Sequence, residues 1–142
     1  MEKESIELPG ASKYGPYSAG VRANGMIWLS GQIAVEAGDD VQAQTQGALD
    51  KIDALLATSQ LSKLNLCFAQ VLLADINDFA AMNEIYGAWV EGIEIRPARA
   101  AFAAASTSSA VPMLIVAKAS SVAGFITSIV SRPAGSTHSP LI

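Results

Sequence analysis

Apolar residues recur along the chain in two different spacings. In residues 40–58 and 79–89 they fall three or four positions apart, as on one face of an α-helix. In residues 26–30, 64–76 and 113–120 they form short runs of the kind that strands are made from. The pattern therefore predicts two helices and at least three strands.

Acidic and amide side chains mark where both predicted helices begin. Asp39 stands before the first helix, where its carboxylate can accept hydrogen bonds from the first N–H groups, and Gln42 follows as in a capping box. Asn77 or Asp78 takes the same place before the second. Gly47 costs the first helix about 1 kcal/mol relative to alanine and is expected to allow close packing. The apolar stripes are Val41, Thr45, Ala48, Ile52 and Leu55 or Leu56, and then Phe79, Met82, Ile85 or Tyr86, and Trp89.

The run at residues 64–76 is apolar on both of its faces. One face carries Leu66, Phe68, Leu72 and Ala74, and the other carries Cys67, Ala69, Val71 and Leu73. Such a strand is predicted to be buried on both sides. Two helices can cover only one face of the sheet, and an uncovered apolar face would aggregate. A second copy of the chain is the economical cover for the other face.

The remaining segments are less regular. Residues 98–106, ARAAFAAAS, favour a helix by propensity, because alanine is the best helix former. Residues 11–20 are dense in Gly, Pro and Ser and indicate a loop. The residues before them are predicted to be loose or to form a short strand at Ile6–Leu8. Residues 121–142 read as a tail that contains Ser, Pro and Gly and one apolar patch, GFITSIV.

The composition excludes several classes of protein. Hydrophobic residues make up 51% of the chain and charged residues 15%, which leaves too few charges to cover every face and favours contact between subunits. The nine basic residues are scattered and the formal net charge is −4, so RNA or DNA is disfavoured as the main partner. No apolar run reaches the roughly 18 to 20 residues of a membrane span. The first ten residues lack a signal-peptide pattern, so we expect a cytoplasmic protein with no membrane partner.

Several chemistries lack the side chains that they need. The one histidine, His138, lies in the tail, so no Ser-His-Asp or Cys-His arrangement is supported. The one cysteine, Cys67, is predicted to be a small buried hydrophobe and has no partner for an internal disulfide. The sequence also contains no Cys/His cluster with the spacing of a zinc site, so no metal site is predicted.

Three motifs follow one another along the chain. They are YGPYSAGVRANGMIWLSGQIA at residues 14–34, ADINDFAAMNEIYGAWV at residues 74–90 and RPAR at residues 96–99. Each motif is weak alone, but their order and spacing make the set specific. Over about residues 11–120 the chain resembles the Rid family (YjgF, reactive intermediate deaminases, also described as endoribonuclease L-PSP-like).

The resemblance implies a fold and a subunit arrangement. The family fold is α+β, chorismate-mutase-like, with a mixed sheet and two helices packed on one face. Three subunits assemble with their sheets facing inward as a barrel-like core, which fits the two-faced strand above. The resemblance also implies a strand at residues 99–105, against the helix propensity. One domain is therefore expected over residues 1–120, followed by an extension of unknown role at residues 121–142.

The resemblance implies a chemistry as well. Deaminase-type members hydrolyse reactive enamines and imines, such as 2-aminoacrylate, to a keto acid and ammonia in a pocket between adjacent subunits. They use no cofactor and no metal. An imine carbon is already electrophilic, so the protein has to hold the substrate carboxylate, orient the imine and place a water. The expected partners are a small carboxylate ligand and two further copies of the chain.

Five residues match family site positions directly. Arg99 matches the arginine that binds the substrate carboxylate bidentately, and its plain alternative is a solvated arginine before a strand. Tyr17 matches the GPY tyrosine, which donates a hydrogen bond or shields the imine, unless it simply packs on the core. Ser30 and Gly31 match a strand end where the backbone approaches the ligand, and Asn83 matches a helix asparagine near the site. Arg99 and Tyr17 are the candidate catalytic residues.

Two family residues are replaced. Ungapped alignment from Arg99 puts Leu114 where deaminase-type members carry the glutamate that positions the attacking water, and residues 111–120 contain no carboxylate. Ala101 replaces the usual cysteine after the arginine, although its backbone N–H can still bind the carboxylate. Loss of one general acid–base group typically lowers a rate by about 10²- to 10⁴-fold.

Three functions therefore stay open. The first is an imine or enamine hydrolase that acts through Arg99, with the water held by backbone carbonyls and Tyr17. The second is a trimer that binds a keto acid or a related carboxylate without chemistry, which the replacement at Leu114 favours. The third is an endoribonuclease, an activity also attributed to family members, against which the acidic charge and the lack of a histidine outside the tail weigh.

Overall fold

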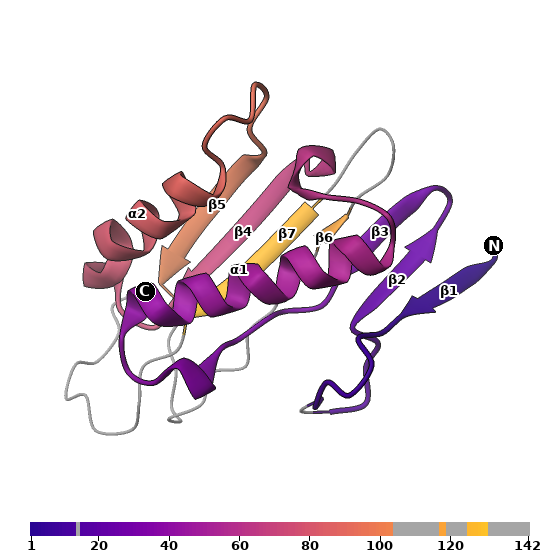
Figure 1. Cartoon of the computed structure of the whole chain (residues 1–142), viewed down its shortest axis with the longest axis horizontal. Helices are drawn as coiled ribbons and strands as arrows, with labels where there is room; N and C mark the ends of the chain where they lie inside the picture. The colour runs from indigo at the N-terminus through magenta and orange to yellow at the C-terminus, as the bar shows by residue number, and fades with distance from the viewer. Residues whose placement is uncertain (14, 104–116, 119–124, 131–142) are drawn as a thin grey trace.

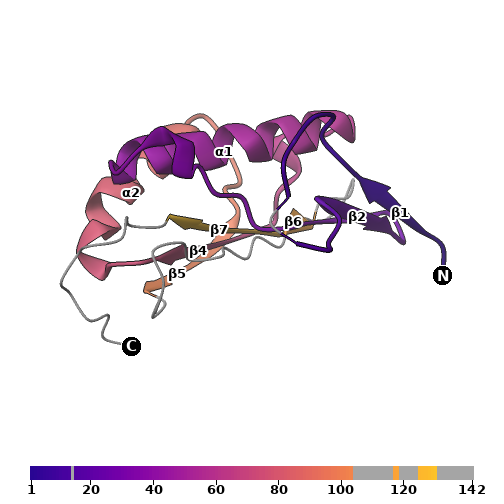
Figure 2. The ribbon, with the colours of Figure 1, turned by 90° about the horizontal axis from the view of Figure 1, so that it is seen from below.

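The computed structural model describes residues 1–13, 15–103, 117–118 and 125–130 (Figure 1). A mixed sheet carries both described helices on one of its faces, as the edge-on view in Figure 2 shows. This confirms the predicted α+β chain with two helices on one side of a mixed sheet. The elements are β1 (Lys3–Ile6), β2 (Gly20–Ala23), β3 (Met26–Leu29), α1 (Val41–Thr58), β4 (Phe68–Leu73), α2 (Phe79–Trp89), β5 (Ala98–Ala103), β6 (Ala117–Lys118) and β7 (Phe125–Val130), with 3₁₀ turns at Val35–Ala37, Lys63–Asn65 and Ile76–Asp78.

The strand order in the sheet is β1-β2-β3-β7-β4-β5, with β6 paired to β3. The hairpins β1–β2 and β2–β3 are antiparallel, whereas β7 runs parallel to both β3 and β4, and β4 runs parallel to β5. The parallel strands β4 and β5 are joined through α2, as parallel pairing requires a crossover. Strand β5 therefore lies at one edge of the described sheet and β1 at the other.

The C-terminal part of the chain differs from the sequence pattern. Strand β7 comes from the segment expected to be an extension, and it lies inside the sheet between β3 and β4. Of the strand predicted at residues 113–120, the described part is β6, and the other residues of that run lie outside the described residues. The boundary at residue 120 stays a prediction.

Strand β5 forms where propensity alone favours a helix, because pairing with β4 along its whole length overrides a weak local preference.

Helix α1 begins one residue later than its sequence pattern indicated. Asp40, not Asp39, is the N-cap, and its Oδ2 accepts a hydrogen bond from the Ala43 N–H at 2.9 Å. Asp39 and Asp40 both fit the sequence pattern of an N-cap, and only the backbone conformation of the folded chain decides that Asp40 takes this position. The Gln42 side chain is not part of a capping box, since its amide donates to Glu84 of α2 at 2.7 Å.

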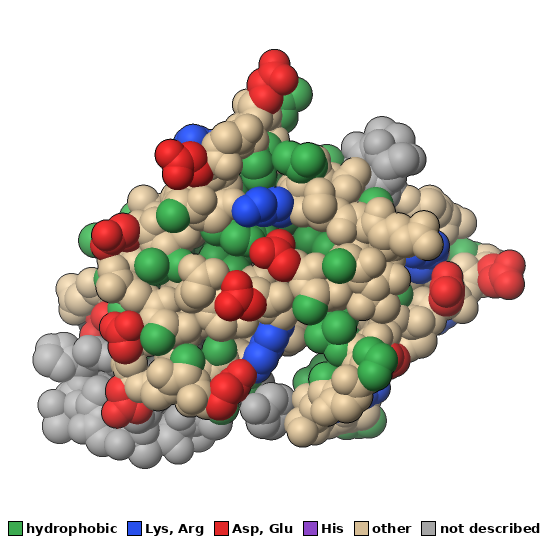
Figure 3. All heavy atoms as spheres, viewed as in Figure 1, with side chains coloured by type: hydrophobic (Ala, Val, Ile, Leu, Met, Phe, Trp, Pro, Cys, Tyr) green, Lys and Arg blue, Asp and Glu red, His purple; other side chains and the backbone are tan. Residues whose placement is uncertain are grey.

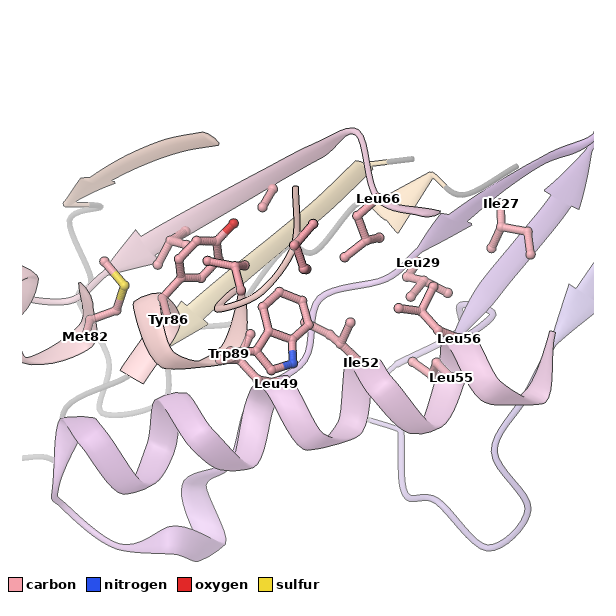
Figure 4. Packing of buried hydrophobic residues seen from close by; sticks show 14 of the residues in the cluster. Ile27, Leu29, Leu49, Ile52, Leu55, Leu56, Leu66, Met82, Tyr86 and Trp89 are labelled. Carbon is pink, nitrogen blue, oxygen red and sulfur yellow. The ribbon is translucent and has the colours of Figure 1, made fainter. Parts of the chain in front are cut away.

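The core lies between the sheet and the two helices (Figure 4). Its most enclosed side chains come from both layers: Leu29, Ile52, Leu55, Leu56, Leu73 and Met82. Gly47 lets α1 approach the loop after β3, because a Cβ at that position would lie 2.6 Å from the Cβ of Ala34. The close packing expected at Gly47 is confirmed.

Helix α2 begins without the side-chain cap that the sequence predicted. Asp78 occupies the N-cap position but makes no capping bond there. Asp75 caps the preceding 3₁₀ turn instead, accepting from the Asn77 N–H at 2.9 Å. The chain enters α2 directly from this turn, whose geometry replaces a side-chain cap.

The two faces of the sheet are covered differently. On β4, Ala69, Val71 and Leu73 are buried beneath the helices, whereas the alternate residues are only half-buried in the single chain. On the same open face, Trp28 and Phe102 keep 39% and 41% of their surface exposed. The expectation that the strand is buried on both sides is thus not met within one chain.

Cys67 is exposed, so the prediction of a buried core cysteine is wrong. It lies just before β4, where the preceding residue, Leu66, is buried toward the helices. The alternation of β4, in which Ala69, Val71 and Leu73 are buried, would place Cys67 beneath the helices, but the strand begins only at Phe68 and the alternation does not extend back to Cys67. The run at residues 64–76 begins as a 3₁₀ turn, Lys63–Asn65, and becomes a strand only at Phe68.

Candidate functional site

Arg99 is the second residue of β5, and its side chain lies on the helix side of the sheet. Its register partner on β4 is Ala69, which is buried beneath the helices. The guanidinium carbon lies 4.6 Å from the ring centroid of Tyr86 and 5.7 Å from that of Phe79, both on α2. Arg99 is therefore a half-buried residue within β5 whose guanidinium group contacts two aromatic rings.

The hydrogen-bonding edge of Arg99 has no partner within the described part of the chain. No described carboxylate, carbonyl or hydroxyl accepts a hydrogen bond from its guanidinium group, and no described acid forms an ion pair with it. The contacts with the two rings are made by the guanidinium carbon and are not hydrogen bonds, and the group carries five N–H donors. A carboxylate fits such donors bidentately.

The backbone of β5 adds a donor on the same strand. The Ala98 N–H donates to the Cys67 carbonyl, 2.9 Å away at the start of β4. Successive N–H groups of a strand point in opposite directions, so the N–H of Ala101 points away from β4. Because β5 is an edge strand, this N–H faces the open edge of the described sheet, two residues from Arg99.

Asn83 lies near the same place. It is exposed on α2, four residues after Phe79 and three before Tyr86, so it shares the helix face that carries both rings. The structure thus brings Arg99, Ala101 and Asn83 to one edge of the molecule. Leu114 lies outside the described residues.

Tyr86 is the most buried member of this group. Its side chain is 7% exposed, and its hydroxyl has no hydrogen-bond partner among the described residues. Burial raises the pKa of the phenol, and the positive charge of Arg99 opposes that shift only in part. The phenol therefore stays neutral at physiological pH and presents an uncharged ring to the guanidinium.

Tyr17, Ser30 and Gly31 form a second group, at the loop before β2 and the end of β3. The Ser30 N–H donates to the Ala19 carbonyl at 2.8 Å, and its hydroxyl donates to the Ser18 carbonyl at 2.6 Å. Ser30 thereby fastens the loop to the end of β3. Tyr17 is 40% exposed, so part of its side chain is accessible from outside the chain.

Tyr17 and Gly31 line a cavity of about 380 Å³ that also reaches α1. Two ion pairs lie in its wall: Lys13 pairs with Glu7 at 2.9 Å, and Lys51 pairs with Glu36 while donating to the Ile33 carbonyl at 2.6 Å. The hydrogen bond from Lys13 lowers the pKa of Glu7, and the hydrogen bond from Lys51 lowers that of Glu36. Both carboxylates are ionised at neutral pH, and Arg99 is not part of this cavity.

One chain does not bring the two groups together. Trp28 of β3, Phe125 of β7, Phe68 of β4 and Ala98 of β5 lie in one register row across the sheet. Three strand-to-strand steps of about 4.8 Å separate the ends of this row, so the start of β5 lies about 14 Å from β3. Arg99 and the Tyr17 group therefore belong to different ends of the molecule.

Sequence reasoning missed the rings that hold Arg99. The apolar periodicity of the second helix predicts Phe79 and Tyr86 as core residues, with Ile85 as an alternative to Tyr86. The available signal was their separation of seven residues, two helical turns, which puts both on one face. The four charged residues of the cavity wall were missed as well, because they are far apart in sequence.

Charges elsewhere on the helix face are mixed in sign. Figure 3 shows acidic and basic side chains interspersed over the helices, without a basic stripe. In the described ranges, no group of three or more His, Cys, Asp or Glu residues is placed to hold a metal ion. The described helices include none that is long and apolar enough to span a membrane.

Comparison with known proteins defines the class. The family model described as Endoribonuclease L-PSP matches residues 10–120. A RutC family protein of Pyrococcus abyssi is 36% identical over 108 residues, covering 71% of this chain and 84% of that protein. TdcF of Escherichia coli, whose name assigns it to the reactive intermediate deaminases, is 38% identical over 88 residues, covering 58% of this chain and 67% of TdcF.

Solved structures agree with this class. The Rid-family protein YyfA of Yersinia pestis superposes with a TM-score of 0.72 at 31% identity, covering 84% of this chain and 99% of YyfA. A structure of Escherichia coli TdcF with bound serine gives a TM-score of 0.67 at 32% identity, covering 82% and 95% of the two chains. The fold is that of a Rid-type α+β protein. The chain belongs to the Rid/YjgF/endoribonuclease L-PSP family.

Proposed function

We propose that the protein hydrolyses small 2-imino or enamine acids to keto acids and ammonia, with the substrate carboxylate held by Arg99. The observation that carries this proposal is the state of Arg99. Its guanidinium is half-buried against two rings, and among the described residues nothing accepts its in-plane donors. The outward N–H of Ala101 supplies a further donor for the same carboxylate. A pre-oriented cation with unused donors suits a small anionic ligand.

The chemistry needs few protein groups. A 2-amino-2-enoic acid such as 2-aminoacrylate takes up a proton at carbon and releases one from nitrogen to become the 2-imino acid. Water then adds to the C=N carbon, the C–N bond breaks, and ammonia leaves as the C=O bond of the keto acid forms. Arg99 binds the carboxylate in every one of these species, and Tyr17 donates a hydrogen bond at the imine or shields it from bulk water.

The proposed site needs a second subunit. Because Arg99 and the group of Tyr17, Ser30 and Gly31 lie at different ends of one chain, a neighbouring copy has to bring its Tyr17 group to the β5 edge. The open sheet face with its exposed Trp28 and Phe102 supports such an assembly, since this apolar surface would be covered by further copies. A closed trimer with the sheets inward is the arrangement that we propose.

The alternative is a trimer that binds a small carboxylate without chemistry. Its support is the absence of any carboxylate in residues 111–120, where Leu114 takes the position of the family's glutamate. Arg99 and Ala101 would serve this function equally well. The serine bound to TdcF illustrates a small amino acid as a ligand of a related protein. Ribonuclease activity has less support, because the chain is acidic and its charges are interspersed.

A coupled assay separates the two proposals. A serine dehydratase generates 2-aminoacrylate, and the release of pyruvate is followed with wild type, Arg99→Ala and Arg96→Ala, since Arg96 is an exposed arginine three residues away. Acceleration that is lost only in Arg99→Ala supports the hydrolase. If wild type gives no acceleration but pyruvate still raises its melting temperature through Arg99, the binding protein is supported. Failure of both readouts overturns both proposals.

A further inference from the structure

The rings beneath Arg99 are themselves fixed in place. Tyr86 makes a tilted ring contact with Trp89, with centroids 5.7 Å apart and an interplanar angle of 53°. The Trp89 indole N–H donates to Asp53 Oδ2 of α1 at 2.9 Å. Figure 4 shows Tyr86 and Trp89 in the layer between the helices and the sheet, with Trp89 over α1. A continuous series of contacts therefore runs from Asp53 on α1 through Trp89 and Tyr86 to Arg99 on β5.

This arrangement bears directly on how an arginine recognises a carboxylate. A long side chain with several rotatable bonds has to be held in one orientation before its fork can meet two carboxylate oxygens. The guanidinium carbon lies over the ring of Tyr86, 4.6 Å from its centroid, and over that of Phe79 at 5.7 Å. The end of the Arg99 side chain thus contacts side chains of α2, although Arg99 itself belongs to β5.

The ring of Tyr86, rather than its hydroxyl, makes this contact. The hydroxyl has no hydrogen-bond partner among the described residues and is shielded from solvent. Removal of such a group leaves the ring contact intact and costs no hydrogen bond to a described residue. The two parts of the side chain can therefore be tested separately.

We propose that Tyr86 is a positioning residue that sets the orientation of Arg99 for a carboxylate, with Phe79 as the weaker second support. The proposal rests on the proposed function in one respect only, that Arg99 binds the carboxylate of the ligand. Tyr86 does not touch the ligand in this scheme. Its contribution passes through Arg99 and disappears when Arg99 is removed.

The test compares Tyr86→Phe, Tyr86→Leu and Arg99→Ala with the double variant Tyr86→Leu/Arg99→Ala. Pyruvate binding is measured by titration calorimetry on the assembled protein, together with kcat and KM in the coupled assay where activity is found. We expect Tyr86→Phe to bind as wild type does and Tyr86→Leu to bind about 5- to 30-fold more weakly. In the Arg99→Ala background the leucine substitution should have no further effect.

Loss of packing has to be separated from loss of positioning. Leu56→Ala removes a fully buried side chain of α1 and serves as the control for destabilisation, with melting temperatures measured for all variants. If Tyr86→Leu does not fold, Phe79→Ala takes its place, because Phe79 is partly exposed and its loss should weaken binding a few-fold.

Each outcome decides one point. Equal binding by Tyr86→Leu and wild type, or an additive effect in the double variant, overturns the positioning role. Weaker binding by Leu56→Ala to the same extent as Tyr86→Leu overturns it as well, since the effect would then be general. Wild-type binding by Arg99→Ala would instead overturn the proposed function on which the inference rests.

Discussion

The basic side chains at the two ends of the sheet have different surroundings. At the Tyr17 end, Lys13 and Lys51 are each paired with a glutamate and each donate to a backbone carbonyl. At the β5 end, Arg99 lies on aromatic rings, and none of the described residues accepts a hydrogen bond from it. The paired charges hold loops in place, whereas the donors of the arginine are not used by any residue in the described ranges and are the ones that we propose for the ligand. The lysines that form ion pairs thus belong to the structural scaffold, although they line a cavity, whereas the arginine outside such a pair is the one that we propose for ligand recognition.

Replacement of Arg99 should have the largest effect. Arg99→Lys keeps the charge but loses the planar fork and the ring contact, so we expect affinity for pyruvate and any deaminase kcat/KM to fall by about 30-fold or more. Titration calorimetry and the coupled assay measure this. Lys13→Arg at the other end is the matched control and should leave both values nearly unchanged. Equal losses in the two variants would remove the distinction between the ends.

Gly47→Ala should disturb the Tyr17 end through packing alone. The new methyl group would lie 2.6 Å from the Cβ of Ala34, so α1 or the loop after β3 has to move. We expect a loss of about 1 to 3 kcal/mol in the free energy of unfolding, measured by urea denaturation. Unchanged stability would show that the loop yields freely and that this end is not a rigid scaffold.

Gly87→Ala is the counterpart on α2. A Cβ at Gly87 meets no atom within 4 Å, and the position is exposed, so only helix propensity changes. We expect a gain of about 0.5 to 1 kcal/mol in the free energy of unfolding. Pyruvate affinity should not change, and a marked loss would show that the β5 end has a neighbour over this part of α2 in the assembly.

The smallest effect concerns pH at the Tyr17 end. The pKa of Glu36 in the folded protein lies below its ordinary value because Lys51 donates a hydrogen bond to it. Its contribution to stability is therefore present above about pH 4.5 and is lost as the pH falls below that value. Glu36→Gln should lower the free energy of unfolding at pH 7 by less than about 1 kcal/mol, since the pair is largely exposed. The difference from wild type should shrink as the pH falls from 4.5 through the lowered pKa of Glu36, and a difference that does not depend on pH would assign the effect to packing.

The sequence was most informative where one local pattern decided the outcome. The stripe from Val41 to Leu56 predicted α1 within one residue at its start, and the stripe that ends at Trp89 predicted α2. It was least informative where two choices were locally equal. Asp39 and Asp40 fit the same capping pattern, and only the path of the chain selects Asp40.

The candidate site was likewise only partly predictable from the sequence. The RPAR motif identified Arg99 as a candidate, but its contact with Tyr86 depends on how α2 crosses over β5, which periodicity does not encode. The aromatic stripe predicts core residues, and Tyr86 is indeed buried. Its packing in the core therefore gives no sign in the sequence of the positioning role that we propose. Cys67 shows the reverse case, because its apolar neighbours suggest burial whereas it lies before the first residue of β4 and is exposed.

The position of β5 at the edge of the described sheet has a consequence for the behaviour of a single chain. An edge strand offers a row of outward N–H and C=O groups to any other strand, and this one reads ARAAFA. Arg99 is the only charged side chain in it, and a charge on an edge discourages strand addition. The residue that we assign to ligand binding thus also acts as a gatekeeper against aggregation. Arg99→Ala should show more light scattering during refolding than Arg99→Lys, which makes the lysine variant the cleaner probe of recognition.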